Sequence, residues 1–306
     1  MPQLITTLGP KSAHEMKLIL PHEHVFVDLR TWDQPGYAQA EAADVVKLMA
    51  PEIEKIRALG ITALVECSTG GVGRRADLDK AVSDATNFAI VLPTGFYREP
   101  WIPPWVHEAT EDKLYQFMLA ELQGTIEESG VQAGWIKLSA GDDDITDCER
   151  KVLRAAIRAA KETNAIIGSH TIKGRVVKDQ LAIFDELGHS PSRFIWIHTQ
   201  AEEDASLHLE MAKRGVWLEF DGIGAEDQPD DGYLEKINRV LDAGYEKQVM
   251  LSHDRGWYDP AQPNGGTPQP YTYLKQTFLP KLRNSGVDEA TITQLTHTNP
   301  FNAFAR

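Results

Sequence analysis

The sequence predicts an α/β fold, a (β/α)8 TIM barrel with extra C-terminal helices. Short apolar runs rich in Ile and Val alternate with longer amphipathic segments, which is the order expected of parallel β-α units. Eight such units over about 250 residues have the size of this barrel. Histidines and an aspartate end several runs, which a doubly wound sheet, the rival fold, does not explain. No linker or low-complexity tract interrupts the chain, so residues 1–306 are expected to form a single domain.

Eight apolar runs predict the strands. Each is short and bounded by polar or turn-forming residues, as strands usually are. In chain order they are Leu18–Asp28, Ile61–Cys67, Phe88–Phe96, Gly134–Ser139, Ala165–His170, Arg193–His198, Val216–Phe220 and Val249–Asp254.

Amphipathic segments between these runs predict the helices. They are Ala42–Leu59, Asp112–Glu128, Asp147–Thr163, Val176–Leu187, Asp204–Arg214 and Tyr233–Ala243. Several are followed by glycine, which adopts the left-handed backbone at a helix end without strain. These glycines are Gly60, Gly188, Gly215 and Gly244. From Thr272 to Arg306 we expect two closing helices, with Asn299-Pro300 breaking the last.

The composition argues against several classes of protein. Hydrophobic content of 42% and charged content of 25% are ordinary for a chain with a sizeable core. A net charge of −14, with no basic block, argues against nucleic acid or an anionic membrane as a partner. Without a signal peptide or a long apolar stretch, no membrane span is expected and the expected location is the cytoplasm. Cys67 and Cys148 make no disulfide framework, and we expect both to serve packing.

Histidines and an aspartate form a candidate metal site. His22 and His24 lie two apart in the first predicted strand, so both imidazoles project to one side, spaced to hold one metal ion. Later runs end in His170, His198 and Asp254. Because the carboxyl ends of barrel strands meet on the face that carries the active site, these side chains should converge. Such donors predict a site for zinc or a similar divalent ion.

Lys137 stands inside the apolar run of the fourth predicted strand. Burial disfavours the ammonium and lowers its pKa, which favours the neutral amine. A neutral amine beside metal ions can take up carbon dioxide and become a carbamate, which converts a cation into a carboxylate able to bridge two metals. The alternative is a lysine that extends its ammonium to the rim of the barrel.

This pattern resembles the phosphotriesterase-related (phosphotriesterase-like lactonase) branch of the amidohydrolase superfamily. The resemblance rests on the strand-end donors, on Lys137 and on the segments around them, and it extends from about Thr6 to Phe304. Those segments are Leu20-Pro21-His22-Glu23-His24, Thr94-Gly95-Phe96-Tyr97, Leu251-Ser252-His253-Asp254 and Thr298-Asn299-Pro300.

The resemblance implies a binuclear centre, usually of zinc, with cobalt or manganese as substitutes. In that pattern the two histidines of the first strand and Asp254 hold the more buried ion. His170 and His198 hold the more exposed one, and N6-carboxylated Lys137 bridges both. The implied mechanism is attack by a metal-bridging hydroxide on a carbonyl or phosphoryl group, with Asp254 as the general base.

The implied substrate is an ester. Tyr97 stands where lactonase-type members carry a tyrosine that contacts the substrate, whereas strict triesterases resemble a tryptophan-bearing version of that loop. Triesterases also carry histidine after the aspartate that ends strand seven, and lactonases carry arginine there. This chain has Gly222 after Asp221, and Ala201 instead of an acid three residues after His198, so it matches neither group fully.

The segment from Arg255 to Tyr271 is a long loop rich in Gly, Pro, Trp and Tyr, a composition typical of lids and binding loops. Arg255, Trp257 and Tyr258 directly follow Asp254 and are candidate substrate-binding residues, with packing as the alternative for Trp257. Trp101 and Trp105 are candidates for the opposite wall. The remaining histidines are expected to be structural or on the surface, and His253 should point away from Asp254. They are His14, His107, His189, His208, His253 and His297.

The sequence therefore predicts a metal-dependent hydrolase that cleaves a lactone or another carboxylic ester. Phosphotriester hydrolysis is the first alternative. A metal-loaded barrel that binds a ligand without catalysis is the alternative from another class. The expected partner is a small ester substrate, and a homodimer is possible, since barrels of this type are commonly dimers.

Overall fold

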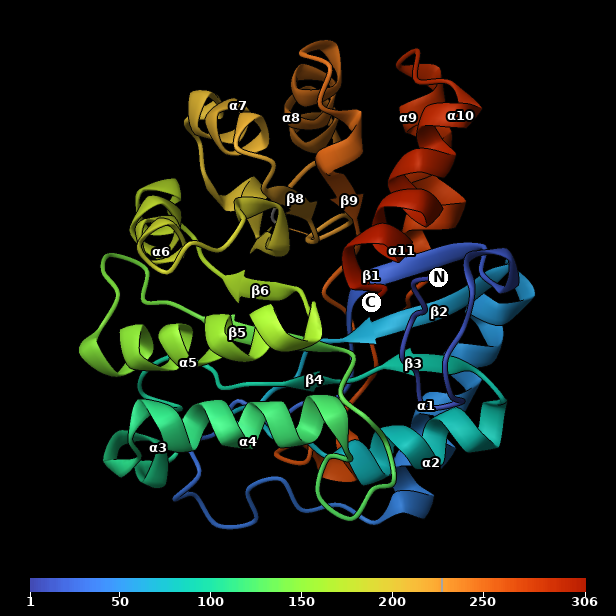
Figure 1. The fold of residues 1–306 in the computed structure, drawn as a ribbon. Coiled ribbons are helices and arrows are strands. Elements are labelled where there is room, and N and C mark those ends of the chain that lie inside the picture. Colours follow the sequence, from blue (N-terminus) through green and yellow to red (C-terminus); the bar gives the residue numbers. More distant parts are fainter. Residues whose placement is uncertain (227) are drawn as a thin grey trace.

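The computed structural model describes residues 1–226 and 228–306, in which ten short strands run parallel in two sheets (Figure 1). One sheet has the order β10-β1-β2-β3 and the other β4-β5-β6-β7-β8-β9. The bounds are β1 Leu18–Phe26, β2 Ile61–Glu66, β3 Ala89–Val91, β4 Pro93–Thr94, β5 Trp135–Ser139, β6 Ile167–His170, β7 Phe194–Ile197, β8 Trp217–Phe220, β9 Val249–Leu251 and β10 Gly256–Tyr258.

Two seams join the sheets into a barrel. At the first seam, β3 and β4 form one strand that is interrupted at Leu92. The next residue, Pro93, has no N–H group to donate to a continuous ladder of backbone hydrogen bonds. At the second, beside β9, the Asp254 amide donates to the carbonyl of His22 over 3.2 Å, and the His22 amide donates to Ser252 Oγ over 3.1 Å. The predicted barrel is thereby confirmed.

Eleven α-helices of the described chain alternate with the strands and surround them. Their bounds are α1 Ala42–Ala58, α2 Ala76–Thr86, α3 Pro104–Glu108, α4 Glu111–Gln123, α5 Asp147–Thr163, α6 Gly174–Glu186, α7 Ala205–Lys213, α8 Asp230–Asp242, α9 Leu279–Asn284, α10 Glu289–Thr293 and α11 Asn299–Phe304. Local sequence explains the ends: Thr146 caps α5 in a reciprocal pair with Glu149, and Gly244 after α8 has φ of +82°.

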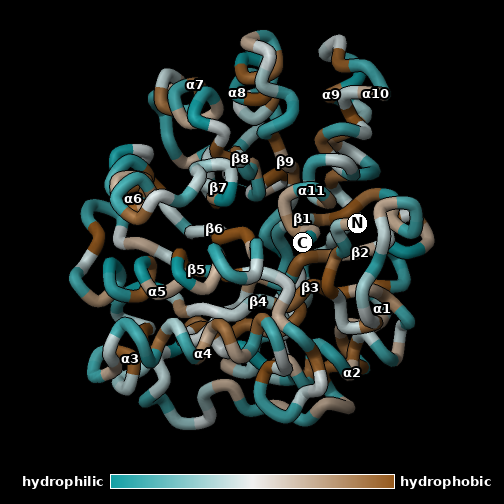
Figure 2. The backbone as a smooth tube through the Cα atoms, in the orientation of Figure 1, coloured by the Kyte–Doolittle hydropathy of each residue, from teal (hydrophilic) through white to brown (hydrophobic). Residues whose placement is uncertain are grey.

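Apolar side chains form two separate cores. One fills the inside of the barrel, where alternate strand residues such as Ile19 and Ile195 meet. Helix α11 closes its amino-terminal end, and the rings of Trp135 and Phe304 meet edge to face at 5.2 Å. The second core lies between strands and helices, and brown, hydrophobic stretches alternate with teal along those helices in Figure 2. The inner core does not fill the carboxyl ends of the strands, where polar side chains line a cavity.

Three expectations about the elements were wrong. The predicted strand Phe88–Phe96 is split into β3 and β4, because proline cannot donate to the ladder. The segment after Asp254 begins with a strand, β10, which pairs with β1 through His24 and Phe26. Asn299-Pro300 does not break the last helix: α11 begins there after a π-helical turn, and proline is tolerated in a first turn.

Among the described residues, every helix is too short or too polar to cross a bilayer.

Candidate metal centre

The six predicted metal ligands lie together at the carboxyl ends of the strands. They line one cavity of about 230 Å³. The strand order brings them there from β1, β5, β6 and the segments after β7 and β9, although up to 232 positions separate the first from the last in sequence (254 minus 22). The cavity is lined by His22, His24, Val27, Leu29, Cys67, Val72, Tyr97, Lys137, His170, His198, Asp254 and Trp257.

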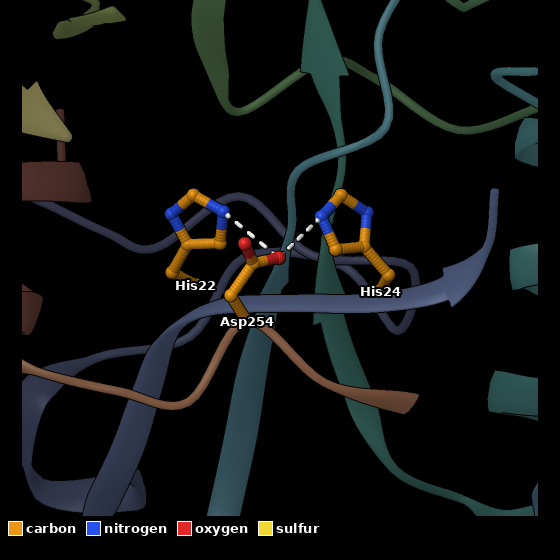
Figure 3. Close-up of side chains that lie close together, drawn as sticks. All are labelled: His22, His24 and Asp254. Atoms are coloured by element: carbon orange, nitrogen blue, oxygen red, sulfur yellow. Dashed lines mark ion pairs between the residues drawn. The ribbon is translucent and has the colours of Figure 1, made fainter. Parts of the chain in front are cut away.

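Asp254 lies between the two histidines of β1 (Figure 3). Its Oδ1 is 3.0 Å from Nε2 of His24 and 3.6 Å from Nε2 of His22. All three donor atoms lie within 4.8 Å of one another. Asp254 adopts a left-handed backbone with φ of +59°, and so does His198 with φ of +64°. Non-glycine residues seldom adopt this conformation, and it is concentrated at functional sites.

Nδ1 of each of the four histidines has a hydrogen-bond partner. For His22 and His24 this arrangement orients the ring and leaves Nε2 beside Asp254, as in known metal sites with an outer ring of hydrogen-bond partners. The partner of His170, Tyr97, itself lines the cavity. The pairs are His22 with Glu219 at 2.9 Å, His24 with Ser68 at 2.8 Å, His170 with Tyr97 at 3.1 Å and His198 with Asp221 at 2.7 Å.

The donors fit divalent metal ions. Nε2 of His170 is buried and has no hydrogen-bond partner among the described residues. The rings of His170 and His198 lie 4.4 Å apart between centroids, and those of His22 and His198 lie 5.2 Å apart. Imidazole nitrogens with a carboxylate are a ligand set typical of zinc. A buried ring nitrogen without a partner is what a missing cation would leave.

The electrostatics of the centre favour cation binding. Burial, and then the positive charges of neighbouring groups, hold the pKa values of His22 and His170 well below the usual range, so both rings are neutral at pH 7. Burial also acts to lower the pKa of His24, but Asp254 and Glu66 outweigh it and raise that pKa to about 9. Burial acts to raise the pKa of Asp254, yet His24 lowers it to about 2. Without metal, His24 and Asp254 therefore form an ion pair.

Lys137 lies on β5 with 2% of its surface exposed. Its neighbours Ile136 and Leu138 pack outward against the helices, whereas Lys137 lines the cavity. Its Nζ lies 5.9 Å from the ring of Trp135. The side chain thus stays inside the barrel and does not extend to the rim, which rules out the alternative considered for it.

Two carboxylates stand behind the histidines and are absent from the predicted site: Glu219 is the partner of His22, and Asp221 is the partner of His198. Both carboxylates are buried and lie two apart at the end of β8, so they face the same side as the histidines they contact. Burial raises the pKa of Glu219 well above its usual range, and its Oε1 has no partner within the described chain. An acid in the apolar run Trp217–Phe220, two before Asp221, is the signal that would have identified it.

The glycine after Asp221 has a structural reason. A Cβ at Gly222 would lie 2.4 Å from Oη of Tyr233 and 3.0 Å from Nε2 of Gln200. Gln200 itself donates to Asp221 Oδ1 over 2.7 Å. The side chains of Tyr233 and Gln200 fill the space beside Gly222. There is therefore no room at this position for the histidine of triesterases or the arginine of lactonases.

Of the four predicted substrate-binding residues, the structure brings two to the cavity. Tyr97 and Trp257 line it, and the ring of Trp257 meets His24 edge to face at 5.6 Å. The other two lie elsewhere. Tyr258 stacks on Phe26 between the barrel and the helices, because successive strand residues face opposite sides. Arg255 donates to the carbonyl of Gly224 and lies over the ring of Tyr273.

Of the two tryptophans after β4, one lies beside the cavity and the other lies away from it. Trp101 packs against Tyr97 with centroids 5.5 Å apart, and its Nε1 donates to the carbonyl of Leu29, which lines the cavity. Trp105 instead packs against Phe96 and Phe117. Trp101 therefore supports the wall behind Tyr97, and Trp105 belongs to the outer core.

His253 points away from the centre, as predicted. Its Nδ1 lies 2.6 Å from Glu23, and its Nε2 accepts from the amide of Leu274 over 2.7 Å. Glu23 also accepts from the amide of Arg255. Glu23 on β1 and His253 after β9 thus bind each other, and they fix the backbone that carries Asp254.

The fold and this cluster of donors define a barrel of the metal-dependent hydrolase type, and comparison with known proteins gives the family. The model of the phosphotriesterase family matches residues 2–304. The chain belongs to the phosphotriesterase family, whose members are metal-dependent hydrolases with a binuclear centre.

Individual relatives cover nearly the whole chain. A phosphotriesterase homology protein of Escherichia coli K12 is 28% identical over 93% of this chain and 97% of its own. A solved structure described as organophosphate hydrolysis activity engineered from a weak promiscuous lactonase template has a TM-score of 0.88 at 29% identity, over 99% of each chain. A triple mutant of an organophosphorus hydrolase from Deinococcus radiodurans has a TM-score of 0.87 at 30% identity, over 99% of this chain and 97% of that one.

The names of more distant relatives differ in chemistry. An aryldialkylphosphatase of Saccharolobus solfataricus is 25% identical over 83% of this chain and 84% of its own. An N-acetyltaurine hydrolase of Dictyostelium discoideum is 26% identical over 81% of this chain and 70% of its own. Family membership therefore establishes the hydrolase class and leaves the scissile bond to be inferred from the site.

Proposed function

We propose that this protein is a hydrolase of carboxylic esters, with lactones as the leading substrates. The observation that carries the proposal is Tyr97: it lines the cavity, and its hydroxyl lies 3.1 Å from Nδ1 of His170. Burial raises the pKa of Tyr97, so the hydroxyl keeps its proton and acts as a hydrogen-bond donor at neutral pH. A neutral donor at this wall suits a carbonyl or ring oxygen of an ester.

Two divalent ions, zinc first and cobalt or manganese as substitutes, are the proposed cofactors. His22, His24 and Asp254 would hold one, and His170 and His198 the other, with Lys137 carboxylated and shared between them. When bound, the ions supply Lewis acidity and lower the pKa of water. Lys137 is buried and lines the same cavity as the histidines and Asp254, which supports its proposed role as the shared ligand.

The chain's own groups then position the substrate and move the proton. Asp254 is the proposed general base, since its carboxylate is ionised at neutral pH and faces the cavity. Val27, Leu29 and Val72 form an apolar wall against which the acyl group would pack. Trp257 closes this wall beside His24.

The size of the cavity favours a compact substrate. Pockets for drug-sized ligands span about 300–1,000 Å³, whereas this one holds about 230 Å³. A lactone or small ester suits that space better than a triester with three substituents, although phosphotriester hydrolysis stays the second candidate because a family relative bears that activity in its name.

A substrate panel tests the proposal. The metal-stripped protein is reloaded with zinc and assayed on lactones, aryl esters, phosphotriesters and N-acyl amides. We expect turnover of a lactone or aryl ester that chelation abolishes and zinc restores. Asp254→Asn should lose it, whereas Asp242→Asn, at an exposed aspartate of α8, should keep it. A zinc-loaded protein that cleaves nothing in the panel would favour a ligand-binding barrel.

A further inference from the structure

A second group of metal-binding side chains lies outside the central cavity. Glu99 is in the loop after β4, His107 is on α3 and Cys148 is the second residue of α5. One donor atom from each lies within 4.8 Å of the other two, and His107 Nε2 is 3.4 Å from Glu99 Oε1. None of the three lines the central cavity.

The backbone that carries these side chains is fixed by two charged groups of α5. The buried carboxylate of Glu149 accepts from the amide of Glu99 over 3.2 Å. Lys151 Nζ donates to the carbonyl of His107 over 2.8 Å and to those of Val106 and Ala109. The loop, α3 and α5 are thus held together before any ligand binds, so the three donors need little reorganisation to meet.

The donor set selects the kind of cation. A thiolate, an imidazole and a carboxylate together suit a borderline-soft ion such as Zn²⁺, and hard ions such as Ca²⁺ and Mg²⁺ take oxygen donors. Glu99 is a partly exposed anion and His107 has 44% of its side chain exposed, so a hydrated ion can enter and keep a water as a fourth ligand. Burial raises the pKa of the Cys148 thiol, so the ion would displace its proton to solvent on binding.

We propose that Glu99, His107 and Cys148 form a third Zn²⁺ site, separate from the central pair. An ion here ties the loop after β4 to α3 and α5. That loop also carries Tyr97, whose hydroxyl contacts His170, so the site stabilises the wall of the central cavity without touching it. The site is structural in this account and takes no part in hydrolysis.

Cobalt substitution tests this site directly. The full-length protein is stripped of metal and titrated with Co²⁺, and bound metal is counted while the near-ultraviolet spectrum is recorded. We expect three ions per chain and a thiolate-to-cobalt charge-transfer band that grows with one of them. Cys148→Ser should bind two ions and lack the band. Cys67→Ser is the matched control, since Cys67 lines the central cavity, and it should keep the band.

A second pair of variants keeps the test independent of the cysteine. His107→Ala should weaken binding of the third ion at least tenfold, whereas His14→Ala, at another exposed histidine, should not change it. Zinc at the third equivalent should raise the melting temperature of the wild type and not that of His107→Ala. The proposal is overturned by a wild type that shows no band at saturating Co²⁺, or by a Cys148→Ser variant that keeps both the band and the third ion.

Discussion

Oε2 of Glu219 lies 2.9 Å from Nδ1 of His22, and both side chains are buried inside the barrel. The carboxylate fixes the ring so that Nε2 faces Asp254. A carboxylate behind a metal-binding histidine also makes the imidazole a stronger ligand. We therefore expect Glu219 to influence metal affinity, although it stands outside the predicted ligand set.

Replacing Glu219 should weaken metal binding. Glu219→Gln keeps a similar shape and replaces the carboxyl group behind His22, so we expect the metal affinity to fall about 10–100-fold. Competition with a chelator of known affinity measures the change. Glu41→Gln, at an exposed acid before α1, serves as the control. Equal affinities in the two variants would show that Glu219 does not act on the metal.

Removing Lys137 should remove metal and activity together. In Lys137→Ala the shared carboxylate cannot form, so we expect metal content to fall and a short-chain carboxylic acid to restore part of it. Lys213→Ala, at an exposed lysine, should keep its metal. Incubation with carbon-13 bicarbonate should give a carbamate resonance in the wild type only. A metal-loaded wild type without that resonance would refute carboxylation.

The ion pair between His24 and Asp254 should make the metal-free protein sensitive to pH. The pKa of His24 is raised to about 9, so its contribution to stability is complete below about pH 6.5, the unfolded pKa, and is lost as the pH rises through 9. The pKa of Asp254 is lowered to about 2, so its contribution is present above about pH 3.8 and is lost as the pH falls through 2.

Urea unfolding of the metal-free protein measures this effect. Between pH 7 and pH 10 we expect the free energy of unfolding to fall more steeply in the wild type than in Asp254→Asn, where the partner of His24 is neutral. Groups far from the centre titrate equally in both proteins, so the difference reports the pair together with the neighbours that Asp254 influences, such as Cys67 and Glu219. Parallel pH profiles would contradict the assignment.

Adding a side chain at Gly222 should destabilise the fold. The Cβ would lie 2.4 Å from Oη of Tyr233, so we expect Gly222→Ala to cost about 1–3 kcal/mol, as overpacking does. Tyr233→Phe in the same chain should recover part of that loss, because it removes the atom in closest contact. Gly232→Ala, where nothing lies within 4 Å, should be neutral or stabilising. Additive losses in the double variant would contradict the steric account.

Strand periodicity was sufficient to predict most of the site. His22 and His24 share a face because they lie two apart, and the same alternation correctly turned His253 away from Asp254. Alternation does not predict the outward orientation of Tyr258, because the sequence predicts a loop after Asp254. Its pairing with β1 depends on contacts between residues more than 200 positions apart, such as His24 with Gly256 (256 minus 24 is 232).

Buried acids were harder to predict from sequence. Glu219 stands in an apolar run where a charged side chain is costly unless a partner is present, and its partner His22 lies 197 residues away. The close packing around Gly222 could not be predicted from the sequence either, because Tyr233 belongs to the next helix, α8. Composition and spacing are sufficient to predict the metal ligands. The groups that orient these ligands come close to them only when the barrel closes, so the sequence does not reveal them.

The central claim is that the six donors hold two divalent ions. Crystals of the Cys148→Ser variant soaked in zinc, measured with X-rays above and below the zinc absorption edge, test it most directly. We predict two anomalous peaks in the central cavity, one beside His22, His24 and Asp254 and the other beside His170 and His198, with continuous density from Lys137 to both. A single peak, or none at these donors in zinc-saturated crystals, would contradict it.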